Sequence, residues 1–361
     1  MDKITKLEGL SFFRGKRVFI TGHTGFKGSW LSFLLASIGA DVMGYALAPN
    51  TEPNHFDMLG LSRDISHVIG DIRDAKFMQS QIKAFKPEIV FHLAAQALVK
   101  NSYIDPVLTF DTNIMGSLNL LEAVRHSDSV KSLVYITSDK CYENLEWVWG
   151  YRENDRLGGR DPYSASKAAA EIVFDAYTRS YFSAVDGFGA ASARAGNVIG
   201  GGDWAADRIV PDCIRAITTG NAIKLRNPFS TRPWQHVLEP LSGYLALAKS
   251  LYESPKKFQG PWNFGPNSSE VRTVEDVAKS IIRTFGKGEI ELLSPGAMHH
   301  EANLLQLNCD KANAILGWRP TWGVEKTFQI TGEWYRWVAN GNNAREITQA
   351  QVKEFFEGVT L

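Results

Sequence analysis

Short apolar runs alternate with longer stretches of helical periodicity through the first half of the chain. This alternation is typical of βαβ units, which build a parallel sheet. A helix is expected over Ser29–Ile38, closed by Gly39 at its carboxyl end. The expected strands are Arg17–Thr21, Asp41–Leu47, Ser66–Ile69, Ile89–Leu93 and Leu133–Thr137. Because ligands of open α/β sheets bind outside the carboxyl ends of the strands, residues at those ends are the first candidates for function.

The composition of the sequence changes beyond Arg194, where glycine and proline become frequent. Helical stretches such as Leu241–Leu251 and Thr273–Phe285 are separated there by loops. We therefore expect an α/β fold with a doubly wound parallel sheet of the Rossmann type over residues 1–195, completed by return segments around 237–265. Residues 196–236 and 266–361 are expected to form a smaller, interleaved region that binds the substrate.

The charges of the 361-residue chain balance, with 39 lysines and arginines against 39 aspartates and glutamates. No global field attracts nucleic acid or a membrane, and we expect neither as a partner. The three cysteines are widely spaced, which favours a reducing compartment and indicates neither a disulfide framework nor a metal site. The first residues lack the apolar core of a signal peptide, and no stretch approaches the roughly 18 apolar residues that span a bilayer. We expect a soluble, cytoplasmic protein.

A glycine-rich loop, TGHTGFKG at residues 21–28, connects the first expected strand to a helical pattern. Gly22 would allow a tight turn, Gly25 would let the backbone approach a pyrophosphate, and Gly28 would permit close packing of helix against sheet. The helix N-terminus adds amide donors and a positive dipole end. Between a strand and a helix this loop predicts a dinucleotide site, the alternative being a glycine-rich turn without a ligand.

The second expected strand does not decide between NAD and NADP. Residues 45–48 contain neither the acidic residue that holds the adenosine ribose nor an arginine for a 2′-phosphate. Asp71 follows the third strand and could accept a hydrogen bond from the adenine amine. Its alternative is a turn or helix N-cap aspartate.

Tyr163 and Lys167 lie four residues apart at the start of a long helical pattern, which places them on one helix face. A lysine ammonium there would lower the pKa of the phenol and make Tyr163 a usable base. Alone, the pair could be an exposed helix face, but Ser138 stands at the carboxyl end of the strand upstream. A hydroxyl, a phenol and an ammonium around one carbinol suit proton removal coupled to hydride transfer to a nicotinamide.

The chain resembles the extended short-chain dehydrogenases/reductases over nearly its whole length. The motifs that carry the resemblance are TGHTGFKG, GDIRD, FHLAAQ, TNIMGSLNLLEA, YITS, YSASK and ARAGNVIGGGD. Within that class it is most similar to the nucleotide-sugar 4,6-dehydratases, in particular to the branch that acts on CDP-D-glucose. The features that indicate this branch are Ser138-Asp139-Lys140, Trp204, Arg232 and MHHEA at residues 298–302.

The resemblance implies NAD as a bound cofactor that is reduced and reoxidised in each turnover. Besides Tyr163 and Lys167, the residues that it assigns to the cofactor are Gly22, Gly25, Phe26, Gly28, Asp71, Ile72, Ala94, Ala95, Gln96 and Asn113.

The resemblance also implies CDP-glucose as substrate, with Asp139 as the acid that protonates the leaving C6 hydroxyl. Lys140 stands where relatives acting on dTDP-glucose carry a glutamate that removes the C5 proton, so a lysine would have to be the base. The alternative for both residues is a solvated turn pair.

Four further residues are assigned to the substrate by the same resemblance. Asn197 would contact the phosphate or the hexose, Arg208 and Arg232 the diphosphate, and Glu301 the ribose hydroxyls. Each arginine could instead be a surface residue. Trp204 and Trp234 could pack a base, with core packing as the default.

Two other functions stay open. A nucleotide-sugar 4-epimerase shares Ser138, Tyr163 and Lys167 but needs no acid and base at 139 and 140. A non-catalytic dinucleotide-sensing protein would need none of them. Helices over Asn113–Val124 and Ser164–Phe182 resemble those of a four-helix dimer interface, so we expect a homodimer or homotetramer, although these apolar faces could equally be intrachain core.

Overall fold

The computed structural model describes residues 10–267, 270–293 and 304–357. Within them, the largest sheet has seven strands in the order β11-β6-β5-β4-β1-β2-β3, and every pairing in it is parallel. The strands are β1 (Arg17–Thr21), β2 (Asp41–Ala46), β3 (Ser66–Ile69), β4 (Ile89–His92), β5 (Ser132–Ile136), β6 (Gly189–Ala195) and β11 (Gly260–Phe264). This confirms the expected Rossmann-type sheet, in which the strand order reverses between β1 and β4.

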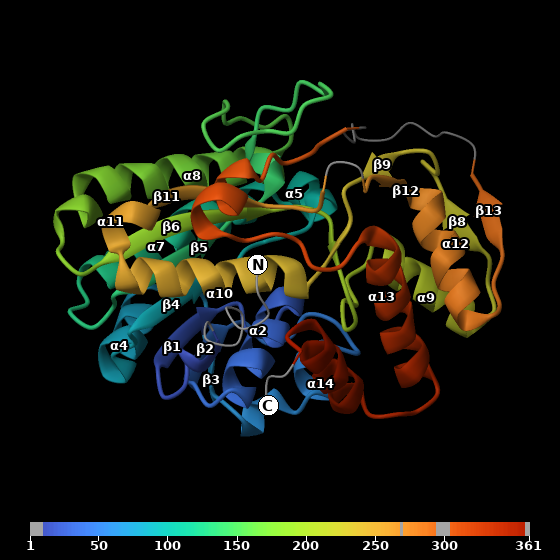
Figure 1. The fold of residues 1–361 in the computed structure, drawn as a ribbon, viewed down its shortest axis with the longest axis horizontal. Helices are drawn as coiled ribbons and strands as arrows, with labels where there is room; N and C mark the ends of the chain where they lie inside the picture. The colour runs from blue at the N-terminus through green and yellow to red at the C-terminus, as the bar shows by residue number, and fades with distance from the viewer. Residues whose placement is uncertain (1–9, 268–269, 294–303, 358–361) are drawn as a thin grey trace.

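Helices cover both faces of the sheet. Because successive side chains of a strand point to opposite faces, each strand contributes to two cores. Val18 and Ile20 of β1 join the core beneath α2 (Phe26–Ser37) and α10 (Leu238–Glu253), whereas Phe19 joins the opposite core. The helices of that opposite face are α4 (Ala75–Phe85), α7 (Ser117–Arg125) and α8 (Pro162–Ser180). Figure 1 shows α10 and α2 in front of the strands, and it shows α8 above the strands in the same view.

The second half of the chain adds a group of helices and short strand pairs beside the carboxyl ends of the sheet (Figure 1, right). Helix α12 (Val274–Phe285) packs against α9 (Ile209–Thr219) and α13 (Val324–Ala339). The short pairs are β7 (Val198–Ile199) with β10 (Gln235–His236), β8 (Ile223–Leu225) with β13 (Ile290–Leu292), and β9 (Thr231–Arg232) with β12 (Arg272–Thr273).

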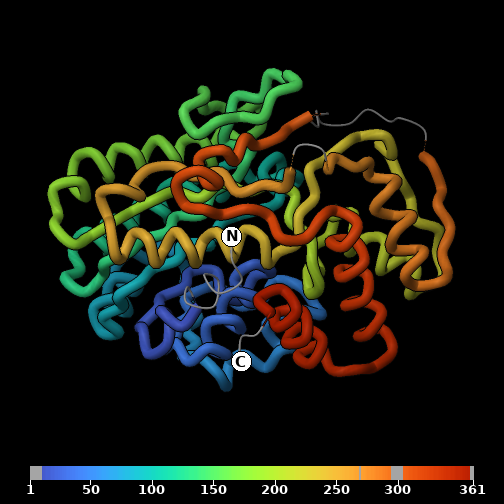
Figure 2. Tube along the Cα trace, viewed as in Figure 1, coloured from blue at the N-terminus to red at the C-terminus, as the bar shows by residue number. Residues whose placement is uncertain are grey.

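The last helix, α14 (Ala344–Phe355), returns to the first part of the chain, and Figure 2 shows this red segment beside the blue one. Arg345 Nη1 lies 2.6 Å from Asp64 Oδ2 and donates a hydrogen bond of 2.7 Å to the Leu59 carbonyl. The expected division at 195, 236 and 265 stays a prediction.

The remaining short elements are connectors. They are α3 (His55–Met58), η1 (Leu61–Arg63), α5 (Val99–Ile104), α6 (Pro106–Phe110), η2 (Asp111–Gly116), η3 (Asp139–Cys141), η4 (Phe182–Ala184), α11 (Pro255–Phe258) and η5 (Ala312–Leu316). No helix among the described residues is long and apolar enough to cross a membrane.

The structure moves several predicted boundaries. Helix α2 begins at Phe26 rather than Ser29, since the glycine loop leads into it without a separate cap. The helix expected over Asn113–Val124 is interrupted, because Asp111–Gly116 is a π-helical turn and α7 starts at Ser117. Helix α8 starts at Pro162, where the Asp161 side chain accepts a hydrogen bond from the Ser164 amide.

Candidate active site

A cleft of about 1560 Å³ lies at the carboxyl ends of the sheet strands. One side is formed by the glycine loop, the segment after β4 and the segment after β5, and the other by residues 196–212 and 224–234 of the second half. The start of α8 contributes Tyr163 and Lys167. This is the position expected for a ligand in an open α/β sheet.

The glycine loop has the geometry of a phosphate-binding turn. Gly22 adopts a φ of 77°, and a Cβ there would lie 2.7 Å from the Ala94 amide nitrogen. A Cβ on Gly28 would lie 2.1 Å from the Gly22 carbonyl oxygen, so only glycine lets α2 approach the loop this closely. A Cβ on Gly25 would lie 3.4 Å from the Gly22 carbonyl oxygen, which is an ordinary contact distance. Gly25 and Phe26 both line the cleft. The loop therefore fits a dinucleotide diphosphate.

Asp71 lies on the cleft wall beside Ile72, and its carboxylate pairs with Arg73 at 2.6 Å. The hydrogen bond from Arg73 holds the pKa of Asp71 below its ordinary value. The N-cap of α4 is Asp74, which accepts from the Phe77 amide, so Asp71 is a turn residue and not a helix cap. Its contact with an adenine stays a prediction.

The segment after β4 brings Ala94, Ala95 and Gln96 to the cleft, but Asn113 does not line it. The Asn113 side chain instead accepts a hydrogen bond of 2.8 Å from the Gln96 amide and donates one of 3.0 Å to the Gln96 carbonyl. It also donates to Ser166 Oγ at 2.9 Å. Because its side-chain amide already makes hydrogen bonds to protein groups, Asn113 supports the segment of residues 94–96 from outside the cleft.

Ser138, Asp139 and Lys140 form a tight turn directly after β5. Ser138 Oγ donates to Asp139 Oδ1 at 2.9 Å, and Lys140 Nζ lies 3.4 Å from the same oxygen. The Asp139 side chain is 2% exposed and that of Lys140 is 35% exposed, so the carboxylate is buried while the ammonium is partly solvated. Their roles as acid and base stay a prediction. Gly196 makes room for the carboxylate, since a Cβ there would lie 1.9 Å from Asp139 Oδ2.

Tyr163 and Lys167 share one face of α8, and both are buried at the cleft. The expected lowering of the Tyr163 pKa by Lys167 is wrong for this structure. Burial raises the pKa of the phenol, while the charge of Lys140 and a hydrogen bond with Ser138 oppose that effect. Burial lowers the pKa of Lys167 to about 8, against the opposing charge of Glu171.

The second half of the chain brings three of the predicted substrate residues to the cleft: Asn197, Arg208 and Arg232. Asn197 adopts a φ of 45°, and its buried Nδ2 has no partner among the described residues. Arg208 pairs with Asp203 at 2.7 Å. Glu301 lies outside the described residues, as does the MHHEA segment.

Two tryptophans add to this wall. Trp204 and Trp234 line the cleft, and the buried Nε1 of each lacks a partner within the described ranges. Together with Asn197 Nδ2 they are three buried donors that have no hydrogen-bond partner among the described residues.

Lys27 is a cleft residue that sequence reasoning missed. It lies in the glycine loop, and burial lowers its pKa to about 8, assisted by the charge of Arg208 and opposed by that of Asp139. The available signal was a lysine inside the glycine-rich motif TGHTGFKG.

A family model described as GDP-mannose 4,6 dehydratase matches residues 19–331. The chain belongs to this family. A protein of Salmonella typhimurium named CDP-glucose 4,6-dehydratase is 48% identical over 97% of this chain and 99% of its own length.

Solved structures show the same fold. DesIV of Streptomyces venezuelae, titled dTDP-glucose 4,6-dehydratase with NAD and TYD bound, is 22% identical and superposes with a TM-score of 0.76 over 90% of this chain and 98% of its own. An epimerase of Methanothermobacter thermautotrophicus, also 22% identical, superposes with a TM-score of 0.80 over 96% and 99%. The same fold therefore occurs in proteins named for both reactions, so the fold by itself does not choose between them.

Proposed function

We propose that this chain converts CDP-D-glucose to CDP-4-dehydro-6-deoxy-D-glucose and water. The observation that carries the proposal is the buried Asp139, held beside Ser138 and Lys140 in the cleft that Tyr163 lines. A 4-epimerase has no use for this acid and base. The 48% identity to the Salmonella CDP-glucose 4,6-dehydratase supports the choice of substrate.

The glycine loop with Gly22, Gly25 and Gly28 would hold NAD, which would supply a hydride acceptor and donor beside the sugar. Tyr163 takes the proton of the C4 hydroxyl, with Ser138 orienting that hydroxyl. The C4 ketone acidifies the C5 proton, which Lys140 removes, and Asp139 protonates the departing C6 hydroxyl. Lys140 Nζ lies 3.4 Å from Asp139 Oδ1, so the proton taken from C5 can be passed to the carboxylate and delivered to the departing hydroxyl. When the hydride then enters C6, a solvent proton delivered through Lys140 enters C5, and the proton taken by Tyr163 is released to solvent.

The substrate side of the cleft supplies donors for the nucleotide diphosphate. Arg208 and Arg232 would contact the diphosphate, where a planar guanidinium makes bidentate hydrogen bonds. Asn197 would use its free Nδ2 on the phosphate or the hexose. We place the reaction in the cytoplasmic supply of deoxyhexoses for surface polysaccharide.

The test of substrate and reaction is a panel of CDP-, dTDP-, UDP- and GDP-hexoses, each incubated with the protein and NAD and followed by product mass. Loss of one water from CDP-glucose alone is the expected result. Turnover of another nucleotide-hexose would correct the substrate, and no turnover of any would favour the non-catalytic alternative.

Isotope labelling separates the dehydratase from the epimerase, which the superposition on an epimerase keeps as the second candidate. Substrate deuterated at C4 should give product with deuterium in a new C6 methyl group, and solvent deuterium should enter at C5. Deuterium retained at C4, with the C6 hydroxyl intact, would identify an epimerase.

We also propose a homo-oligomer, a dimer or a tetramer. Large apolar side chains are exposed along α5, α6, η2 and α8, among them Ile104 (75%), Val107 (77%), Met115 (49%) and Ile172 (58%). An apolar surface of this extent on neighbouring helices is typical of a subunit interface. Sedimentation of the protein and of a Val107→Glu variant tests this, with dissociation expected in the variant.

A further inference from the structure

We propose that the buried ion pair of Glu171 and Arg194 positions the catalytic turn, residues 138–141, by holding it at both ends and tying it to the helix that carries Tyr163 and Lys167. Glu171 and Arg194 are then positioning residues, since neither lines the cleft. The inference rests on the proposed dehydration, because it assigns these residues to the placement of its acid and base.

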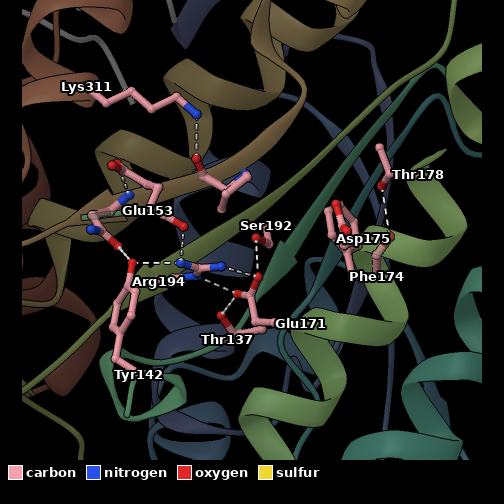
Figure 3. Close-up of polar contacts among 12 residues, drawn as sticks. Thr137, Tyr142, Glu153, Glu171, Phe174, Asp175, Thr178, Ser192, Arg194 and Lys311 are labelled. Atoms are coloured by element: carbon pink, nitrogen blue, oxygen red, sulfur yellow. Dashed lines mark hydrogen bonds and ion pairs between the residues drawn. The ribbon is translucent and has the colours of Figure 1, made fainter. Parts of the chain in front are cut away.

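Glu171 accepts hydrogen bonds from three residues on two segments, Thr137 directly after β5 and both Ser192 and Arg194 on β6. Its Oε1 accepts from Thr137 Oγ1 and from Arg194 Nε, the latter at 3.0 Å. Its Oε2 accepts from Ser192 Oγ at 2.8 Å and from Arg194 Nη2 at 2.8 Å. Figure 3 shows Thr137, Ser192 and Arg194 converging on this carboxylate. Burial would raise the pKa of Glu171, but the charge of Arg194 and these hydrogen bonds hold it below its ordinary value.

Arg194 extends the pair to the far end of the catalytic turn. Its Nη1 donates to the Tyr142 hydroxyl at 2.7 Å and to the Glu153 carbonyl at 3.0 Å. Tyr142 in turn donates to Asn263 Oδ1 of β11 at 2.8 Å. Figure 3 shows Tyr142 and Glu171 on opposite sides of the guanidinium.

The sequence positions of these contacts give the pair its role. Thr137 immediately precedes Ser138, and Tyr142 immediately follows Cys141, so the two contacts bracket the catalytic turn. Glu171 lies four residues after Lys167 and eight after Tyr163, on the same face of α8. One ion pair thus links the turn with the acid and base to the helix with the phenol and ammonium.

Stability alone does not account for such a pair. Both side chains are 3% exposed, and well-packed apolar residues of similar volume at buried ion pairs are often neutral or stabilising. Placement of reacting groups is more sensitive, because a misplacement of about 1 Å can cost about 100-fold in rate. The geometry therefore assigns the pair to positioning.

Two hydroxyls that donate to the same carboxylate provide a matched test. Thr137→Val removes the contact that comes from the residue before the catalytic turn, whereas Ser192→Ala removes the one that comes from β6. We expect Thr137→Val to lower kcat on CDP-glucose about tenfold or more, with KM changed less than about threefold. Ser192→Ala should stay within about twofold of the wild-type kcat, and Thr137→Ser should restore activity because it keeps the hydroxyl.

Equal activity in Thr137→Val and Ser192→Ala, whether both fall or both persist, would overturn the positioning role. Failure of Thr137→Ser to recover kcat would do the same. A wild-type protein that does not dehydrate CDP-glucose would instead remove the proposed function, so the two failures are told apart by the wild-type assay.

A double variant addresses the pair itself without leaving one charge buried alone. Glu171→Met with Arg194→Met should fold cooperatively in thermal unfolding, bind NAD in a fluorescence titration, and lose kcat at least about tenfold. A folded double variant with wild-type kcat would overturn the inference. If the double variant does not fold, the comparison of Thr137→Val with Ser192→Ala decides.

Discussion

Asp139 is the residue whose replacement most directly separates the two halves of the proposed reaction. An amide in its place cannot protonate the departing C6 hydroxyl, although it fills the same space beside Gly196. Asp139→Asn should therefore lower kcat by about 100-fold or more while oxidation at C4 still proceeds. Single-turnover absorbance should show NADH accumulating on the protein. An unchanged rate without NADH accumulation would make Asp139 a structural turn residue.

Tyr163→Phe tests proton transfer at C4. The variant should bind NAD almost normally and lose at least about 100-fold in turnover, because the phenol oxygen moves a proton and the ring remains for packing. A titration of NAD binding and steady-state kinetics together check this. Tyr181→Phe, at an exposed tyrosine, is the control and should keep full activity. Activity of Tyr163→Phe within tenfold of wild type would remove Tyr163 from the base role.

Single residues could be predicted from sequence where local spacing or a strand end sufficed. Tyr163 and Lys167 are four residues apart on one helix, and Ser138 follows a buried strand, so pattern alone brought them to the same edge. Lys27 has a local signal in the glycine-rich motif, but its burial and the pairing of Glu171 with Arg194 could not be found this way. These contacts arise between elements that meet only in the folded chain. The same holds for the charge of Lys140, which acts on the pKa of Tyr163.

At the scale of elements, the end of β6 fixes where the catalytic acid lies. Gly196→Ala would place a methyl 1.9 Å from Asp139 Oδ2, so the carboxylate must move. We expect kcat to fall about 100-fold, because reacting groups tolerate little displacement. Gly265→Ala is the matched control, since Gly265 follows the neighbouring strand β11 and its Cβ would lie 3.4 Å from the nearest atom. Kinetics of both variants, with circular dichroism to confirm folding, check this; equal loss in both would contradict it.

Elements with a strong local pattern were predicted well, and those shaped by tertiary contacts were not. The strands Arg17–Thr21 and Ser66–Ile69 have the predicted bounds. The π-helical turn at Asp111–Gly116 has no counterpart in helical periodicity, and there Asn113 turns its amide toward the Gln96 backbone. The short strand pairs of the second half were read as loops, because pairs of two or three residues leave no periodic pattern.

At the scale of the whole molecule, buried histidines should make the protein sensitive to acid. Burial lowers the pKa of His23, His55, His92 and His236 to about 3. Below pH 6.5 the unfolded chain takes up these protons and the folded chain does not, so stability is lost as the pH falls from 6.5 toward 3. Each buried histidine contributes about 1.4 kcal/mol per pH unit in this window.

Urea unfolding between pH 7 and 5 measures this dependence. His92→Gln should reduce the slope of the unfolding free energy against pH by about one proton. His126→Gln, at a half-exposed surface position, serves as the control. A slope unchanged by His92→Gln would show that His92 is protonated in the folded protein.

The return of the chain to its first sheet has a consequence for biosynthesis. Strand β11 pairs with β6 only after residue 260, and α10 covers the sheet from residue 238 onward, so a nascent chain that ends near residue 195 exposes one apolar face of its strands. The ribosome must therefore release the chain through β11, which ends at Phe264, before this sheet is shielded, and α14 is synthesised later still. Long sequence separations of this kind slow folding and prolong exposure of apolar surface. We therefore expect a ribosome-bound fragment stopped at residue 195 to expose apolar surface of the kind that chaperones bind, and residues 1–195 alone to fold poorly.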